Sequence, residues 1–414
     1  MANYQVTPGG NPKFEPSVAV HLLSPNIIIA ASVNFTTGSP LAGLYRSIDG
    51  GVNWTNTILP PPAGFTGVEA PYVGYGFPNT FILVGHAFPP NGLSGTVVVY
   101  KSTDGGASFS LPVIVDPGYG TFINNDATLI TIDDSQKSPY RGHVYLVYAR
   151  QFNIDFTGRT VTFYQRSADE GLTWDTPVLI SEVEETAAER PDVAVDLFGN
   201  VYVAWINSTP SQNTNFSIRR SFDGGATFGP IIRVSPVTIV PSPLPVPGYA
   251  FRVLTWPAIA ADTSVVPSTS NTLYAVWQDY RLGYSDIFMS KTSDLGMTWS
   301  PPISVTNATP GSQNFFPAID VSPKTGAIKI IYYTNKLNGF DLDVFVAESN
   351  NGGASFVNSR VTTTSFNPNG NSVVPTTLIG DYIDISIIPP DNFIAVWMDT
   401  RTGTQTIFAG NLDP

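Results

Sequence analysis

The chain has 414 residues, of which 42% are hydrophobic and only 13% are charged, a balance that favours a large folded core and excludes an intrinsically disordered protein. Its net charge of -12 argues against nucleic acid or an anionic membrane surface as a partner. The absence of cysteine excludes a disulfide framework, and no apolar run approaches the ~20 residues of a membrane-spanning helix.

One octapeptide, Ser/Thr-x-Asp-x-Gly-x-x-Trp/Phe, recurs six times, with Asn at the Asp position of the last copy. We expect its Asp to accept hydrogen bonds from amides two or three residues on, its Gly to adopt a positive φ, and its aromatic ring to pack on the sheet below. Such repetition predicts a repeat architecture in which the acidic position is structural. The copies begin at Ser47, Ser102, Ser167, Ser221, Thr292 and Ser349, and their acidic positions hold Asp49, Asp104, Asp169, Asp223, Asp294 and Asn351.

Around each octapeptide, the alternation of apolar and polar residues between turn signals predicts four short strands. The octapeptide itself forms the turn between the third and fourth strands of its unit. In chain order, the strands of the first six units are expected over 18–20, 27–31, 44–46 and 57–59; 72–75, 81–84, 96–100 and 113–115; from Thr128, then 144–148, 161–164 and 178–180; 191–195, 201–206, 215–220 and 231–234; 258–260, 273–277, 287–289 and 303–305; and 318–320, 328–332, 344–346 and 359–361.

A seventh unit stops after three strands, expected over 383–388, 393–397 and 406–409. Its fourth strand is predicted at the start of the chain, because residues 4–9 resemble the fourth strand of the fifth unit and also lead into a Phe-x-Pro. Closure of the last sheet by the first strand leaves no loose edge. The sequence therefore predicts an all-β, seven-bladed β-propeller of four-stranded antiparallel blades, a single domain over 1–414 in which about 3–8 complete the blade formed by about 379–412.

The longest irregular stretch is 236–254, which contains five prolines. Such a stretch is compatible with a linker between two domains. Because the repeats continue on both sides, a long loop between two blades is the preferred interpretation.

The octapeptide resembles the Asp-box, also called the BNR repeat, of the sialidase superfamily, and the resemblance covers the whole chain. It implies the propeller fold but no single activity, since Asp-boxes occur in sialidases, other glycosidases, lectin-like proteins and non-enzymes. The Val-Trp-x-Asp-x-Arg segments at 276–281 and 396–401 and Gly380-Asp381-Tyr382 are similar to bacterial exported BNR-repeat proteins. This similarity implies an extracellular, cell-surface or spore-surface protein, although the first ten residues lack the pattern of a signal peptide.

Strand parity places a ligand site at one end of the propeller channel. The turns between first and second strands share one face with the octapeptides, so the starts of the inner strands ring the channel mouth on the opposite face. Aligned on the proline of the inner strands, these residues are Phe14, Glu69, Asp126, Glu189, Thr255, Phe315 and Asp381 two positions before it, and Glu15, Ala70, Ala127, Arg190, Trp256, Phe316 and Tyr382 one position before it.

Five carboxyl groups on one small rim raise one another's pKa or recruit a cation. The functional interpretations are a sugar-binding cleft with aromatic stacking, a general acid/base pair, or a Ca2+ site built from oxygen ligands. The structural alternative is a set of capping and ion-pair contacts between the inner strands. The candidates for catalysis are Glu69, Asp126, Glu189, Asp381 and Tyr382, and those for ligand binding are Arg190, Trp256, Arg281 and Arg401.

Other motifs narrow these interpretations. Arg281 and Arg401 belong to Asp-x-Arg pairs in equivalent loops, for which a structural ion pair within the loop is the preferred interpretation. Sialidases carry Arg-Ile-Pro on the first inner strand, where this chain has Glu15-Pro16-Ser17, and this difference argues against sialidase activity itself. The three histidines, His21, His86 and His143, do not have the spacing of zinc ligands.

Two functions of different classes remain open. The preferred one is a non-catalytic carbohydrate-binding or surface protein with a glycan at the channel mouth, because both the arginine motif and a nucleophile motif are missing. The alternative is a glycoside hydrolase, sialidase-like or another exo-glycosidase, that uses rim carboxylates. Ca2+ is the one cofactor under consideration; self-assembly or a surface protein partner stays open, and neither nucleic acid nor membrane insertion is expected.

Overall fold

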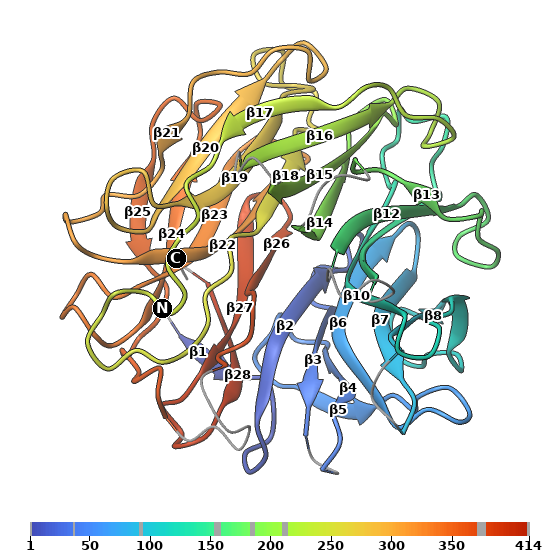
Figure 1. Cartoon of the computed structure of the whole chain (residues 1–414), viewed down its shortest axis with the longest axis horizontal. Coiled ribbons are helices and arrows are strands. Elements are labelled where there is room, and N and C mark those ends of the chain that lie inside the picture. The colour runs from blue at the N-terminus through green and yellow to red at the C-terminus, as the bar shows by residue number, and fades with distance from the viewer. Residues whose placement is uncertain are drawn as a thin grey trace.

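The computed structural model describes residues 2–35, 38–90, 94–152, 159–182, 187–208, 214–370 and 378–411. Within them the chain forms strands and no helix, and the strands make seven four-stranded antiparallel blades around a channel (Figure 1). The predicted seven-bladed β-propeller is therefore confirmed. A single parallel bridge between Thr160 and Ala187 joins the third and fourth blades into one sheet. None of these residues forms a helix long and apolar enough to cross a membrane.

Each blade runs from an inner strand at the channel to an outer strand at the periphery. The first three blades are β2 (Lys13–Val20), β3 (Ile28–Asn34), β4 (Leu41–Ser47) and β5 (Thr55–Ile58); β6 (Gly67–Gly76), β7 (Thr80–Phe88), β8 (Thr96–Ser102) and β9 (Val113–Asp116); and β10 (Ile123–Ile132), β11 (Val144–Phe152), β12 (Arg159–Ser167) and β13 (Val178–Leu179). The next three are β14 (Ala187–Val195), β15 (Val201–Ser208), β16 (Asn215–Ser221) and β17 (Ile232–Pro236); β18 (Pro257–Ala261), β19 (Leu273–Asp279), β20 (Asp286–Thr292) and β21 (Ile303–Ser304); and β22 (Asn314–Val321), β23 (Ile328–Thr334), β24 (Asp343–Ser349) and β25 (Val357–Arg360).

The seventh blade is closed by the start of the chain. It contains β26 (Asp384–Ile388), β27 (Asn392–Asp399), β28 (Thr406–Gly410) and, outermost, β1 (Asn3–Gln5). Tyr4 pairs with Ala409, and beyond the strand the amide of Val6 donates to the carbonyl of Ile407 over 2.9 Å. The first and last strands of the chain, β1 and β28, consequently lie side by side in Figure 1, as the sequence predicts.

The core consists of the spaces between neighbouring blades. The second strands β3, β7, β19 and β23 are almost entirely buried, because another blade packs on each of their faces. Phe216 and Trp277, from adjacent blades, meet edge to face with ring centroids 5.5 Å apart. Outer strands such as β5 and β21 are mostly exposed, so burial of apolar surface stabilises chiefly the middle of each blade.

The octapeptides are tight turns held by their own side chains. In the first copy, the Ser47 hydroxyl accepts a hydrogen bond from the amide of Gly51 over 2.9 Å. The Asp49 carboxylate accepts from the amides of Val52 and Asn53, over 3.2 Å and 2.9 Å. These amides lie three and four residues after the Asp, not two or three as expected, because two residues with positive φ, here Gly50 and Gly51, precede them and lengthen the turn.

Cationic side chains couple octapeptide turns to the blades that precede them in the ring. In each case an Arg or Lys near the end of a third strand donates to the backbone carbonyl of the residue after the acidic position in the next blade. Such a charge-assisted bond fixes the rotation of neighbouring blades at this end of the ring. The pairs are Arg46 with Gly105 (3.2 Å), Arg166 with Gly224 (3.1 Å), Arg220 with Leu295 (2.6 Å) and Lys291 with Gly352 (2.5 Å).

Polar side chains on the inner strands couple the blades around the channel. Asp384 of the seventh blade accepts hydrogen bonds from the amides of Val18 in the first blade, over 2.8 Å, and of Ile385, over 2.9 Å. Burial nevertheless raises the pKa of Asp384 to about 7, against the lowering effect of these amides. The same bond to the next blade joins Asp192 to Ile259 (2.8 Å), Asp320 to Ile387 (2.7 Å) and Ser17 to Val73 (3.1 Å).

The proline-rich stretch 236–254 is a loop between two blades, as preferred from the sequence. It leaves the fourth blade, packs against the sixth and seventh, and returns to start the fifth. The Tyr249 hydroxyl donates to the carbonyl of Phe340, and the side chains of Val240, Leu244 and Phe251 are buried in the large core cluster of this region. The loop consequently forms one wall of the channel mouth and brings Arg252 to it.

Candidate functional site

The backbone at the channel mouth is strained in five of the seven blades. Each of these inner strands begins with a β-bulge, seen as a register shift between the residues on either side of it. The bulge places a non-glycine residue at positive φ, which costs about 1–3 kcal/mol per residue and re-aims neighbouring side chains. The residues, all one position before the proline column, are Glu15 (56°), Ala70 (46°), Ala127 (50°), Arg190 (41°) and Phe316 (52°).

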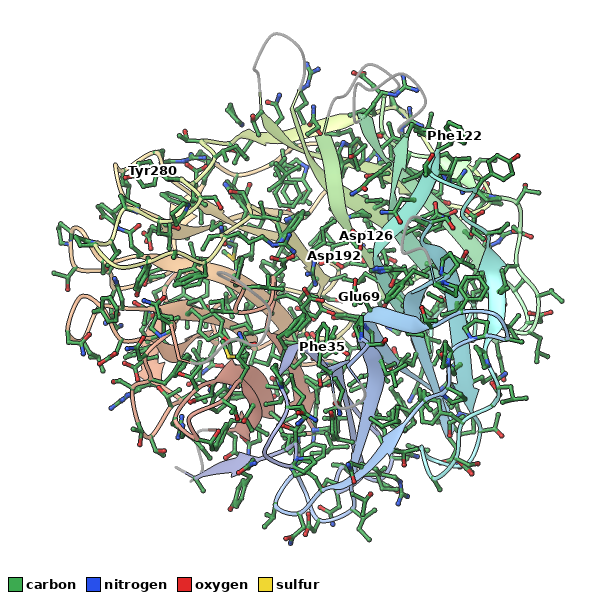
Figure 2. The ribbon with its side chains drawn as sticks, turned by 60° about the horizontal axis from the view of Figure 1, so that its bottom comes forward. Phe35, Glu69, Phe122, Asp126, Asp192 and Tyr280 are labelled. Atoms are coloured by element: carbon green, nitrogen blue, oxygen red, sulfur yellow. The ribbon has the colours of Figure 1, made fainter. Side chains whose placement is uncertain are left out.

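Two carboxylates flank a histidine on the rim. His86 lies opposite Glu69 in the strand pair β6–β7, and its Nε2 is 3.4 Å from Oε2 of Glu69. Its Nδ1 is 3.2 Å from Oδ1 of Asp126, which the third blade supplies. Burial alone would lower the pKa of His86, but Asp126, Glu69 and Glu15 together raise it to about 9. The protonated ring therefore holds two carboxylates that are each 38% exposed, beside one another at the centre of Figure 2.

Glu15 is a carboxyl group on the rim whose pKa is strongly raised. Its residue is only 8% exposed, and burial raises its pKa to about 8, with Asp381 and Glu69 adding to the effect. Arg190 and Arg252 act in the opposite direction without cancelling it. At neutral pH this side chain is therefore a carboxylic acid among carboxylates.

Asp381 is neutralised by an arginine from the loop 236–254. Nε of Arg252 donates to Oδ1 of Asp381 over 2.9 Å, and the Nη2 of Arg252 donates to the other carboxylate oxygen. Burial raises the pKa of Asp381 more strongly than Arg252 lowers it. The arginine side chain is half exposed, so one of its faces remains open to a ligand.

A cation-aromatic stack covers the centre of the mouth. The guanidinium carbon of Arg190 is 3.5 Å from the ring centroid of Tyr382 and 5.8 Å from that of Trp256. Beneath the stack lies a cavity of about 50 Å³ that Asp192 and Asp384 also line. The indole Nε1 of Trp256 is buried without a hydrogen-bond partner. The stack thus separates the rim from the channel interior.

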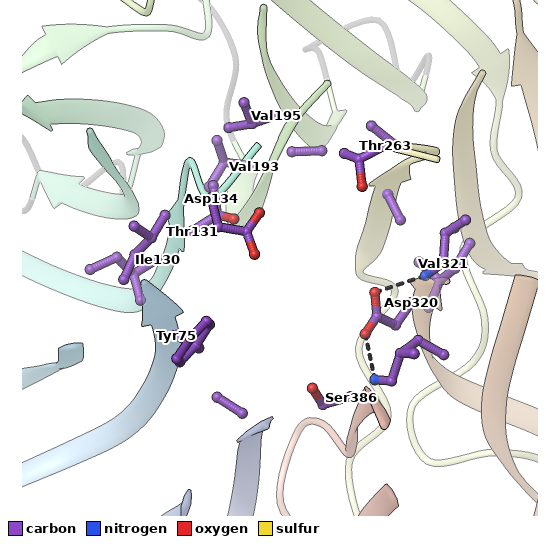
Figure 3. A pocket seen from close by; sticks show the side chains of 18 of the residues that line it. Tyr75, Ile130, Thr131, Asp134, Val193, Val195, Thr263, Asp320, Val321 and Ser386 are labelled. Atoms are coloured by element: carbon purple, nitrogen blue, oxygen red, sulfur yellow. Dashed lines mark hydrogen bonds between the residues drawn. The ribbon is translucent and has the colours of Figure 1, made fainter. Parts of the chain in front are cut away.

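The channel interior opens on the octapeptide face. Its cavity of about 270 Å³ is lined by all seven inner strands, and the Asp134 carboxylate points into it opposite Asp320 (Figure 3). Burial, with Asp133 and Asp320 nearby, raises the pKa of Asp134 to about 7. Among the described residues, no group of three or more His, Asp or Glu side chains is arranged to hold a metal ion, so the interpretation of the rim as a Ca2+ site gains no support.

Two predicted ligand-binding residues are engaged away from the mouth. Arg281 donates to Asp279 over 2.6 Å and also to the carbonyl of Pro236. Arg401 donates to Asp399 over 2.6 Å and to Asn3 on the outermost strand of the seventh blade. The ion pair within each loop, the interpretation preferred from the sequence, therefore describes both arginines, and their assignment to ligand binding stays a prediction.

The other predicted residues gather as the alignment of inner strands suggests. Glu69, Asp126, Arg190, Trp256, Asp381 and Tyr382 all stand at the channel mouth. The side chain of Glu189 lies outside the described residues. Sequence reasoning missed the central role of Glu15, although Glu15 stood in the aligned column, and the role of His86, for which the cross-strand position opposite Glu69 was a signal. Arg252 is one of three arginines, with Arg281 and Arg401, that the comparison with sialidases offers, but it lies in an irregular loop with no local motif to fix its role.

Comparisons with known proteins identify the fold. No protein-family model matches the sequence, and no curated protein is similar to it. Solved structures do match: a Hadza microbial sialidase (TM-score 0.55, 12% identity, 93% of this chain and 73% of that one) and a Penicillium chrysogenum α-L-arabinanase bound to arabinobiose (0.55, 16%, 84% and 97%). An α-L-arabinofuranosidase of Fusarium graminearum covers 100% of this chain and 97% of its own, at TM-score 0.55 and 12% identity. The resemblance stated from the Asp-boxes is thus confirmed at the level of the fold, and the matched structures include glycoside hydrolases.

Proposed function

We propose that the protein is a glycoside hydrolase that binds a carbohydrate at the channel mouth. One observation carries this proposal: carboxyl groups from four blades converge there on a strained backbone, and the pKa of one of them, Glu15, is raised to about 8. Glycoside hydrolysis needs such a pair, with one carboxylic acid of raised pKa and one carboxylate.

The rim residues take the following roles. Glu15 donates its proton to the glycosidic oxygen as the bond breaks. Glu69, close enough to raise the pKa of Glu15, is the partner carboxylate that acts on the sugar carbon directly or through water. His86 lies between Glu69 and Asp126, so its protonated ring orients Glu69 and balances its charge while Asp126 holds the other side of the ring.

The remaining rim groups suit sugar recognition. Trp256 offers a ring face, and Arg190, which covers the buried ring of Tyr382, offers donors for hydroxyl groups. The exposed face of Arg252 is available to a polar substituent. The matched sialidase and arabinan-degrading enzymes support a carbohydrate substrate through the fold alone.

A second candidate is the non-catalytic carbohydrate-binding protein preferred from the sequence. It is favoured by the engagement of Asp381 with Arg252 and of Tyr382 with Arg190, which leaves fewer free groups for chemistry than the sequence suggests. Both candidates use the same site and differ in whether Glu15 transfers a proton.

The deciding experiment combines a panel of chromogenic glycosides, including arabinofuranosides and sialosides, with Glu15→Gln. We expect hydrolysis of at least one glycoside by the parent protein and a fall in kcat of about 100-fold or more in the variant, with KM little changed. Glu170→Gln, an exposed carboxylate on the octapeptide face, is the matched control and should leave kcat unchanged.

Each other result has a defined meaning. Binding of oligosaccharides without hydrolysis by the parent protein establishes the second candidate. Hydrolysis that is equally fast in Glu15→Gln and in the parent protein removes Glu15 as the proton donor. Absence of both binding and hydrolysis contradicts a carbohydrate function at this rim.

A further inference from the structure

Two turns on the octapeptide face have the same backbone but different side chains. The turns 133–143 in the third blade and 262–272 in the fifth blade are equally long. Asp133 donates its amide to the carbonyl of His143 over 2.9 Å, and Asp262 does the same to Thr272 over 2.8 Å. A residue of positive φ stands at the same place in each, Gly142 in one and Asn271 in the other. The two turns are thus an internal comparison at matched positions.

In the third blade, an aromatic ring fills the space between this turn and the next blade. A Cβ on Gly224, in the octapeptide of the fourth blade, would lie 2.5 Å from ring atoms of Tyr140. The Ser138 hydroxyl also donates to the Asp133 carboxylate and closes the turn.

In the fifth blade, the equivalent side chains are smaller. Thr269 takes the place of Tyr140 and lies against Gly352, where a Cβ would be 2.9 Å from its Cγ2. Pro267 takes the place of Ser138, and Oδ2 of Asp262 has no hydrogen-bond partner. The space left between the fifth and sixth blades is a cavity of about 680 Å³. We call it the blade 5–6 cleft.

The walls of the blade 5–6 cleft are polar and aromatic but carry no carboxylate. Lys291, its one ionic side chain, already donates to the carbonyl of Gly352. Three polar atoms of its walls are buried without a hydrogen-bond partner: Oγ1 of Thr269, the hydroxyl of Tyr274 and Nε1 of Trp299. The Thr272 hydroxyl lies near that of Tyr274, but no hydrogen bond of normal geometry joins them. Hydroxyl, amide and indole groups of this kind match neutral, polyhydroxylated ligands.

We propose that the blade 5–6 cleft is a second ligand site that binds a neutral saccharide of about two sugar residues. Its volume lies within the range of ~300–1,000 Å³ that is typical of small-ligand sites. Trp299, which also packs against the core between the fourth and fifth blades, adds aromatic surface to the cleft, and the Ser, Thr and Asn side chains that line it offer donors and acceptors. The site lies on the face opposite the acidic rim, and the proposal does not rest on the proposed function.

The test follows the indole NMR signal of Trp299, assigned by its loss in Trp299→Phe, during titration with maltose, cellobiose and lactose. We expect a saturable shift of this signal with a dissociation constant in the millimolar range, about 1–10 mM, for at least one disaccharide. Thr269→Tyr, which copies the ring of the third-blade turn, should fill the cleft and weaken binding by about 10-fold or more. Thr269→Ser is the matched control and should retain it.

The measurements leave the proposal open to failure. No shift of the Trp299 signal with any of the three disaccharides up to about 50 mM overturns it. Equal shifts in the parent protein and in Thr269→Tyr also overturn it. If Thr269→Tyr does not fold, Asn350→Tyr, at an exposed position on the cleft wall, takes its place with the same expectation.

Discussion

The two faces of the ring shift the pKa of carboxyl groups in opposite directions. At the octapeptide end, exposed carboxylates accept hydrogen bonds from amides and hydroxyls, which lower the pKa of Asp49, Asp169 and Asp294 to about 2. At the channel mouth, burial and neighbouring acids raise the pKa of Glu15 to about 8. One end satisfies its polar groups, and the other concentrates strain and unfavourable charge, which is the usual mark of a functional site.

Backbone strain follows the same division. Positive φ at the octapeptide turns belongs mostly to glycines, for which it costs little, whereas at the mouth it belongs to residues with side chains such as Glu15, Arg190 and Phe316. The comparison teaches that the strain at the mouth is also repeated from blade to blade, but there it falls on residues with side chains, which the bulges direct onto one rim.

The largest expected effect comes from removing β1, the strand at the start of the chain that completes the seventh blade. Deletion of residues 1–7 removes β1, the buried Val6 and the hydrogen bonds to Ile407. We expect a loss of about 3 kcal/mol or more in the free energy of unfolding, measured by thermal and denaturant unfolding. A synthetic peptide of residues 1–10, added in trans, should restore much of it. Unchanged unfolding after the deletion would contradict the observed closure.

The pH dependence of stability separates the two ends. The native protein holds the Glu15 proton up to about pH 8, whereas the unfolded carboxyl releases it near 4.5, so the native state binds more protons in this window and stability falls as pH rises through it. His86, raised to about 9, extends the fall. We expect a loss on the order of a few kcal/mol between pH 5 and 9.

The octapeptide carboxylates act with the opposite sign. Their pKa is lower in the native state than in the unfolded chain, so their contribution is present above pH 4 and is lost as pH falls toward 2. Glu15→Gln should flatten the alkaline slope and leave the acid slope unchanged. An alkaline slope that is the same in this variant would show that other groups produce it.

Loss of one bond between blades should have a smaller effect. Asp384→Ala leaves the buried amides of Val18 and Ile385 without their acceptor, which should cost about 2 kcal/mol in the free energy of unfolding. Glu182→Ala, at an exposed position outside the inner strands, is the control. If the two substitutions cost the same, the inner-strand bonds do not hold the ring together.

The smallest effect is expected at the octapeptide end. Asp104→Ala removes an exposed acceptor for the amide of Ser108 and should cost about 1 kcal/mol. Hydrolysis or binding at the mouth should not change, because the two sites lie on opposite faces. A loss of ligand binding without a loss of stability would reverse the assignment of the two faces.

The sequence predicts the octapeptide end well and the mouth only in outline. Local hydrogen bonds between residues a few positions apart, such as Ser47 to Gly51, leave a pattern that repeats and can be counted. The seven blades and the closing strand follow from it. The alignment of inner strands also brings the correct residues to one rim.

The chemistry at the mouth depends on contacts that have no local pattern. Arg252 reaches Asp381 across 129 positions through an irregular loop, and the neighbours of Glu15 come from other blades. The pKa of a carboxyl group depends on its burial and on the charged groups around it, so residue type alone could not single out Glu15. Arg281 and Arg401 show the opposite case, because their partners Asp279 and Asp399 lie two positions away and the sequence already favours an ion pair within each loop.

The closing seam has a consequence for how the chain is threaded. The seventh blade is joined to the start of the chain at its periphery, where Tyr4 pairs with Ala409, and to the first blade at its centre, where Asp384 accepts the amide of Val18. Neither contact relies on a covalent link between blades. A circular permutant that ties residues 3 and 410 with a short linker and opens the chain at another crossover should therefore form the same ring, so the numbering of its blades is a property of the gene and not of the fold.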